Sequence, residues 1–210
     1  MKKLLLLFAL FAVAASATAS PTERWLDPEC FAVNRAPMRT SFIVFPTASE
    51  AVPENDYTRS PFYRTLNGEW AFLRAERPGA EPEGFFRTGY DDSSWGVMPV
   101  PGIWELNGYG DPVYTNKPYP WYKFFEVKPP LVPHEQNYTG LYRRTVRVPA
   151  DWKGRDAFIH IGSATSNVML WVNGREVGYS EDSKLEAEFD VTRYITPGRD
   201  NLIVLRVNRW

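Results

Sequence analysis

Cysteine and histidine are nearly absent from this sequence, which has one cysteine and two histidines in 210 residues. Cys30 has no second cysteine with which to form a disulfide inside the chain, so a buried or idle thiol is expected. Without a CxxC pair, and with only His134 and His160, the chain lacks the ligands for a histidine and cysteine metal site. No nucleophile pattern accompanies His160, which is expected to be a structural or surface residue. No chemistry is assigned to His134.

A surplus of charge of one sign is also missing. The chain has 24 basic and 25 acidic residues and a formal net charge of −1, and no basic run or stripe stands out. Nucleic acid is therefore not an expected partner, because its binding depends on clustered Lys and Arg. Asp91 and Asp92 are adjacent, but few other oxygen ligands lie nearby. A solvated turn is favoured there over a calcium site.

The amino terminus carries an apolar run that is short for a membrane span. Residues 1–20 read MKKLLLLFALFAVAASATAS, with two lysines, an apolar run and a small-residue A-x-A site. This pattern predicts a secretory signal peptide over residues 1–19, cleaved after Ala19. A membrane helix is the weaker reading, because a span needs roughly 20 apolar residues. The mature protein is thus expected in the periplasm or outside the cell, without a membrane partner.

Helical periodicity is lacking throughout, whereas proline (18 residues) and aromatic side chains (15%) are plentiful. This mix disfavours helices and suits strands joined by rigid turns. Residues 20–64 show neither the helical nor the strand periodicity of apolar residues, but they carry many large apolar groups among prolines. An extended arm packed over another surface is favoured for this segment over a disordered leader.

Strand patterns dominate from residue 65 onward. Pro99 and Pro101 confine their segment to a sheet edge. Residues 139–149 alternate, which predicts a strand with Arg143, Thr145 and Arg147 on a solvated face. Residues 168–172 are apolar at every position, which predicts a strand covered on both sides.

A hairpin follows that strand, because Asn173-Gly174 is the preferred pair for a type I′ turn with two positive φ angles. A further strand is predicted near residues 201–207. About eight short strands without an internal repeat predict an all-β fold, a jelly-roll β-sandwich over residues 65–210.

One loop stands out by its amide. Residues 111–121 read DPVYTNKPYPW, in which Asn116 lies among three prolines. An amide donates and accepts hydrogen bonds, which suits sugar hydroxyls, and a stiffened loop loses little freedom on binding. On the residues alone, a turn closed by Asn116 itself is the favoured reading. The nearby aromatics can stack on sugars or pack against another domain, and they are Tyr114, Tyr119, Trp121 and Tyr122.

Five strings of residues follow one another along the chain: LNGEW, VPGIWELNGYGDPVYTNKPYPW, PPLVPHEQNYTGLYRRTVRVP, WVNGREVGYSEDSKLEAEFDVT and NLIVLRVNRW. In this order they resemble the amino-terminal sugar-binding domain of family 2 glycoside hydrolases, a galactose-binding-domain-like jelly roll. YTN, PPLVP and VGYSEDSKLEAEFD are similar to the branch of large bacterial β-galactosidases of the LacZ type. The arm also resembles the leading segment of those enzymes.

The resemblance implies one domain of a β-galactosidase, an enzyme that hydrolyses terminal non-reducing β-D-galactose residues, and the predicted signal peptide adds that this enzyme is secreted. Asn116 matches the asparagine with which the first domain reaches the galactosyl group in an active site built mostly by a later (β/α)₈ barrel. The two catalytic glutamates and the magnesium ligands lie on that barrel. The chain, truncated before the barrel, is therefore expected to hold no catalytic residue, metal or cofactor and to be inactive alone. Magnesium and sodium are expected for the parent enzyme.

Two other functions stay open. A jelly roll can serve as a stand-alone carbohydrate-binding module, which is an analogy from fold alone. It can also be a structural domain whose arm mediates homo-oligomerisation, as the amino-terminal segment does in the family. The expected partners are accordingly a β-galactoside, absent downstream domains of the same chain and a second copy of the chain.

Overall fold

The computed structural model describes residues 21–51, 56–114, 116, 126, 128 and 130–210. These residues hold nine strands: β1 (Ala32–Val33), β2 (Gly68–Ala75), β3 (Gly96–Val100), β4 (Thr139–Arg147), β5 (Phe158–Ile161), β6 (Asn167–Val172), β7 (Arg175–Ser180), β8 (Ala187–Asp190) and β9 (Asp200–Asn208). The helices are short: α1 (Ala48–Ala51) and 3-10 turns at Pro21–Leu26, Tyr57–Arg59, Glu105–Asn107 and Ala150–Trp152.

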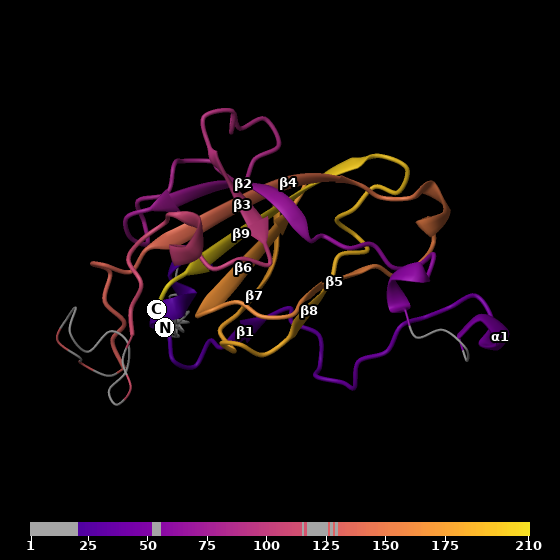
Figure 1. The fold of residues 1–210 in the computed structure, drawn as a ribbon, viewed down its shortest axis with the longest axis horizontal. Coiled ribbons are helices and arrows are strands. Elements are labelled where there is room, and N and C mark those ends of the chain that lie inside the picture. The colour runs from indigo at the N-terminus through magenta and orange to yellow at the C-terminus, as the bar shows by residue number, and fades with distance from the viewer. Residues whose placement is uncertain (1–20, 52–55, 115, 117–125, 127, 129) are drawn as a thin grey trace, which may run out of the picture.

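The strands form two antiparallel sheets (Figure 1). The large sheet has the order β1-β7-β6-β9-β4-β2-β3, and β5 pairs with β8 in the small one. The predicted all-β sandwich is confirmed. The strand that the alternation pattern missed is β1, whose two residues are too few to show a period. Pro99 lies in β3, an edge strand of the sheet, which is where a residue without a backbone N–H donor is tolerated.

Two hydrophobic clusters cover the two faces of the large sheet. One lies between the sheets and joins Val168, Leu170 and Val172 of β6 to Phe189 of β8. The other lies on the outer face and contains Met169 and Trp171 together with Trp25 and Phe85. Side chains of a strand alternate between its faces, so an unbroken apolar strand supplies both clusters. The prediction for residues 168–172 is confirmed, since all of β6 is buried.

The hairpin between β6 and β7 also forms as predicted. Asn173 has φ 52° and Gly174 has φ 77°, as a type I′ turn requires. The Asn173 side chain continues outward and donates to the Tyr194 carbonyl at 2.8 Å. This contact fixes the turn to the segment that precedes β9.

The solvated face predicted for β4 is wrong at Arg143. Its side chain is 3% exposed, because the segment between β2 and β3 folds over it. The guanidinium donates to Asp92 at 2.7 Å and to the backbone carbonyls of Arg87 and Tyr90. Thr145 and Arg147, farther along the strand, are exposed as predicted. The alternation was right, but it did not reveal which part of the face another segment covers.

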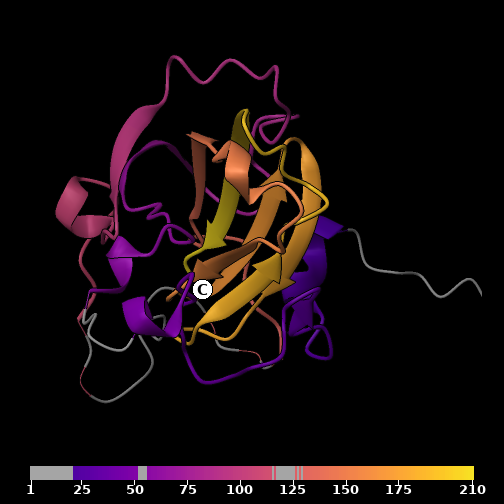
Figure 2. The ribbon, with the colours of Figure 1, turned by 90° about the vertical axis from the view of Figure 1, so that its right-hand side faces the viewer.

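Part of the arm packs along β7 and β8. Ala32 pairs with Ser180 in the sheet, and the amide of Asn34 donates to the Val177 carbonyl at 2.8 Å. The backbone of Ala36 donates to the Glu188 carbonyl at 2.8 Å. Figure 2 shows this indigo segment beside the orange strands. The packed reading thus holds for these residues, while the boundary at residue 64 stays a prediction.

The predicted signal peptide lies outside the described residues. In the part of the chain that is described, no helix has the length and apolarity needed to cross a bilayer.

Candidate functional site

Asn116 lies on the long connection between β3 and β4, and it is exposed. Two residues before it, Tyr114 is 86% exposed. An exposed position leaves the Asn116 amide accessible to a ligand or to another domain. Of the remaining aromatic residues singled out in this loop, Tyr119, Trp121 and Tyr122 lie outside the described residues, as do Pro118 and Pro120.

Aromatic packing anchors the segment that leads to Asn116. The rings of Trp104 and Tyr109 lie 5.9 and 4.6 Å from the ring of Phe72 in β2. The Trp104 indole donates a hydrogen bond to the Tyr142 hydroxyl. A Cβ on Gly140 would lie 2.4 Å from the Trp104 ring, so this close approach requires glycine. The loop is therefore built on the core cluster between the sheets.

The buried phenol beneath the loop has no acid or base role at neutral pH. Burial raises the pKa of Tyr142 to about 12, and the hydrogen bond from Trp104 offsets only part of that effect. The hydroxyl therefore stays protonated. The hydroxyl accepts the hydrogen bond of the Trp104 indole N–H and so fixes the orientation of that ring.

Two carboxylates with little exposure are held by arginine. Glu81, which is 9% exposed, pairs with Arg206 at 2.5 Å, and Glu188 pairs with Arg39 at 2.8 Å. Each of these carboxylates is thus engaged by a guanidinium inside this chain. Asp91 instead accepts from the backbone of Ser93, which lowers its pKa, as expected for a solvated turn. Within the described ranges, no three His, Cys, Asp or Glu side chains are grouped to hold a metal ion.

Neither histidine gains a catalytic setting in the structure. The ring of His134 packs edge-on against Trp25 at 4.8 Å, and His160 lies 3.2 Å from the Glu188 carboxylate with its side chain 45% exposed. Structural and surface roles account for both. Cys30 is partly buried against the hydrophobic cluster on the outer face of the large sheet, and burial raises the pKa of its thiol.

Glu181 is the carboxyl group whose setting is most unusual. It accepts a hydrogen bond from the Tyr179 hydroxyl at 2.6 Å, and its backbone donates to the Phe31 carbonyl of the arm. Burial raises its pKa; the Tyr179 hydrogen bond acts in the opposite direction, and the charge of Asp27 adds to the rise. Glu181 lies under the arm, so we interpret it as part of the arm's contact.

The Glu181 carboxyl gives a pH-dependent prediction. Between its ordinary pKa of 4.5 and its raised folded pKa, the native state binds more protons than the unfolded state, so stability falls as pH rises. The Glu181→Gln variant has no carboxyl group to titrate, so it lacks this loss of stability, and the glutamine amide oxygen still accepts the hydrogen bond from the Tyr179 hydroxyl. We expect the melting temperature of the variant, relative to the parent, to increase from pH 4 to pH 8 in thermal melts. An equal difference at both pH values would contradict the assignment.

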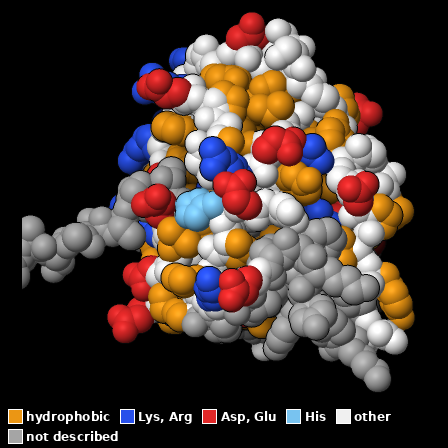
Figure 3. Space-filling model, turned by 90° about the vertical axis from the view of Figure 1, so that its left-hand side faces the viewer, with side chains coloured by type: hydrophobic (Ala, Val, Ile, Leu, Met, Phe, Trp, Pro, Cys, Tyr) orange, Lys and Arg blue, Asp and Glu red, His pale blue; other side chains and the backbone are white. Residues whose placement is uncertain are grey.

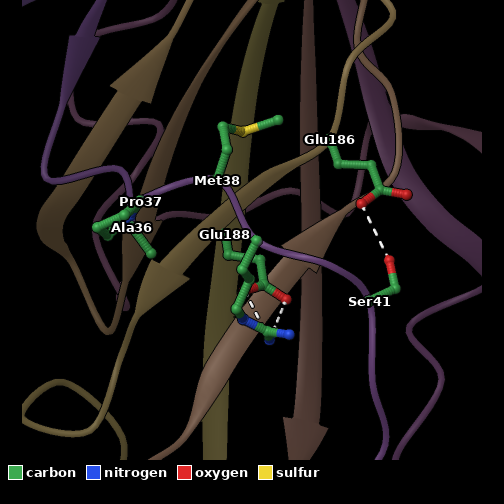
Figure 4. Close-up of a pocket in the computed structure, with 7 residues that line it drawn as sticks. Ala36, Pro37, Met38, Ser41, Glu186 and Glu188 are labelled. Carbon is green, nitrogen blue, oxygen red and sulfur yellow. Dashed lines mark hydrogen bonds and ion pairs between the residues drawn. The ribbon is translucent and has the colours of Figure 1, made fainter.

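Two hollows border the arm and the hairpin. The first, between the arm and β8, has a volume of about 20 Å³, which is room for one water and too small for a sugar ring. Figure 4 shows Ser41 and Glu186 facing each other there, with a hydrogen bond of 3.4 Å. The second is an open groove of about 770 Å³ between residues 83–90 and Gly174. Neither includes Asn116.

The face in Figure 3 shows acidic and basic side chains interspersed, with hydrophobic groups exposed between them. A surface of mixed sign does not select a highly charged partner.

Sequence comparison identifies the protein family to which this fold belongs. Residues 63–210 match the family model described as "Glycosyl hydrolases family 2, sugar binding domain". The chain belongs to glycosyl hydrolase family 2. The predicted resemblance is therefore confirmed at the level of the family, and the match covers every strand of the sandwich except β1.

Among relatives of this family 2 chain are two β-galactosidases. The protein of Priestia megaterium is 38% identical over 184 residues, which are 88% of this chain and 18% of the relative. That of Pectobacterium atrosepticum is 41% identical over 188 residues, or 89% and 17% of the two chains. The family 2 chain thus spans less than a fifth of the length of these relatives.

A solved β-glucuronidase of Bacteroides uniformis shares the fold of this family 2 chain. The two structures superpose with a TM-score of 0.51 and 22% sequence identity, and the match covers 70% of this chain and 14% of the β-glucuronidase chain. At this identity the likeness shows the fold alone, and it agrees with the predicted sandwich.

Proposed function

We propose that this chain is the sugar-binding domain of a larger, exported β-galactosidase and that Asn116 contacts the galactosyl group. The exposed amide of Asn116, on a loop built onto the core by Trp104 and Tyr109, carries the proposal. The β-galactosidases among its relatives support the choice of sugar. Export rests on the leader in residues 1–19.

The chemistry of hydrolysis belongs, in this proposal, to parts of the enzyme beyond this chain. A retaining glycosidase needs two carboxyl groups about 5 Å apart, one of them poised as an acid. Here Glu81, Asp92 and Glu188 each hold an arginine instead. Magnesium and sodium would act at the same distant centre. The contribution of this chain is to position the sugar and to supply a surface for assembly.

A chimera tests the proposal. Residues 20–210 replace the matched portion of the Priestia megaterium relative, and hydrolysis of o-nitrophenyl β-D-galactoside is measured. We expect no turnover from the chain alone and turnover from the chimera. Asn116→Ala in the chimera should lower kcat/KM about tenfold or more, because sugar hydroxyls lose a hydrogen-bond partner in a desolvated site.

Asn67→Ala is the matched control, because Asn67 is also an exposed asparagine, located before β2. This variant should leave kcat/KM unchanged. If Asn116→Ala behaves like Asn67→Ala, Asn116 does not contact the sugar.

A stand-alone carbohydrate-binding module is the second candidate, favoured by the open groove beside Tyr90. One face of that ring is already occupied, since the Arg143 guanidinium lies 5.3 Å from its centre. Titration of the chain alone with galactose and lactose separates the two functions. Millimolar or tighter binding without the rest of the enzyme would favour the module.

A further inference from the structure

We propose that Arg209 is the positioning residue of the loop that carries Asn116. The inference rests on the proposed sugar contact and extends it to a side chain that touches no sugar. Arg209 lies just after β9, far from Asn116 in sequence. Its guanidinium donates to the carbonyl of Asp111 at 3.0 Å, and Asp111 opens the DPVYTN segment.

The same guanidinium holds the helical turn before the loop. It pairs with Glu105 at 2.9 Å, with the two side chains 12% and 20% exposed. Limited exposure reduces the screening of this pair by water, unlike the pair of Arg147 and Asp200, whose side chains are 70% and 64% exposed. One cation therefore joins the turn at residues 105–107 to the start of the loop.

Arg209 is itself firmly placed. Its backbone donates to the Tyr138 carbonyl at 2.8 Å, and its guanidinium carbon lies 5.6 Å from the Tyr138 ring centre. The next residue, Trp210, donates its backbone proton to the fully buried Asn137 at 2.9 Å. The anchor is thus part of the sheet framework, and little freedom is lost when it holds the loop.

The loop needs such an external anchor because of its backbone. Gly108 and Gly110 have φ angles of 83° and 88°, and glycine gives the chain many alternative conformations. The single residue between them, Tyr109, packs on Phe72 of the core. Asn116 lies five residues past Asp111, a reach of at most about 18 Å, so fixing Asp111 restricts where the amide can lie.

Amide exchange in the chain tests the anchor directly. Arg209→Met should raise exchange several-fold in the peptide from Gly108 to Tyr114, while exchange in β4 and β9 stays as in the parent. Arg209→Lys, which keeps a cation, should restore part of the protection. Faster exchange throughout β9, or no change in the loop, would overturn the proposal.

Arg74→Met is the matched control. Arg74 lies 4.3 Å from the same Tyr138 ring, but its guanidinium forms an ion pair with Glu76. This variant should leave exchange from Gly108 to Tyr114 unchanged. An equal rise in both variants would mean that packing on Tyr138, and not the bond to Asp111, orders the loop.

A double-mutant cycle in the chimera links the anchor to the sugar contact. Arg209→Met should lower kcat/KM several-fold alone and have little further effect when Asn116 is already alanine, because the two changes act on one contact. Equal losses in both backgrounds would overturn the role of Arg209 in positioning Asn116. If Asn116→Ala alone has no effect, the proposed sugar contact fails, while amide exchange still decides whether Arg209 holds the loop.

Discussion

Arg206→Met is expected to lower the free energy of unfolding by about 3–5 kcal/mol, the loss found when one partner of a buried ion pair is removed. Arg206 is 1% exposed and pairs with Glu81, which is 9% exposed, across 125 positions of sequence. The variant leaves the Glu81 carboxylate buried without this cation. Urea unfolding at pH 7 measures the loss.

Two further variants make the test specific. Arg147→Met removes an exposed pair at the end of β4, and we expect a loss below about 1 kcal/mol. Combining Arg206→Met with Glu81→Leu removes both buried charges and should recover most of the stability. If Arg206→Met costs no more than Arg147→Met, the buried pair does not hold the segment before β3 against the sheet.

Phe189→Ala is expected to cost about 3–5 kcal/mol of unfolding free energy, the usual range for truncating a buried aromatic side chain. Phe189 is fully buried, and its ring packs so close to Gly178 that an added Cβ would lie 2.7 Å away. The ring joins the small sheet to the large one, and its removal leaves a cavity between them.

Phe158→Ala is the control for this prediction. Phe158 lies in β5 of the same small sheet, but it is 51% exposed. Its truncation should cost less than about 1 kcal/mol in the same urea experiment. Equal losses for the two variants would contradict the view that the buried Phe189 ring holds the two sheets together.

The candidate site was partly predictable. The DPVYTN string pointed to Asn116, and the resemblance assigned it a role that the exposed position allows. Arg209 carried no signal, because an arginine after an alternating strand reads as a solvated charge. Its contacts with Asp111 and Glu105 depend on a loop and a turn about a hundred residues earlier.

The sequence by itself determined the local features and the family. Alternation set the strands, Asn173-Gly174 set the hairpin, and the apolar run of β6 set its burial on both sides. Each of these depends on residues that are near one another in the chain. Tertiary structure alone decided that Arg143 and Arg206 are buried. A strand's period tells which face a side chain takes, but a distant segment, here the one between β2 and β3, decides whether water reaches that face.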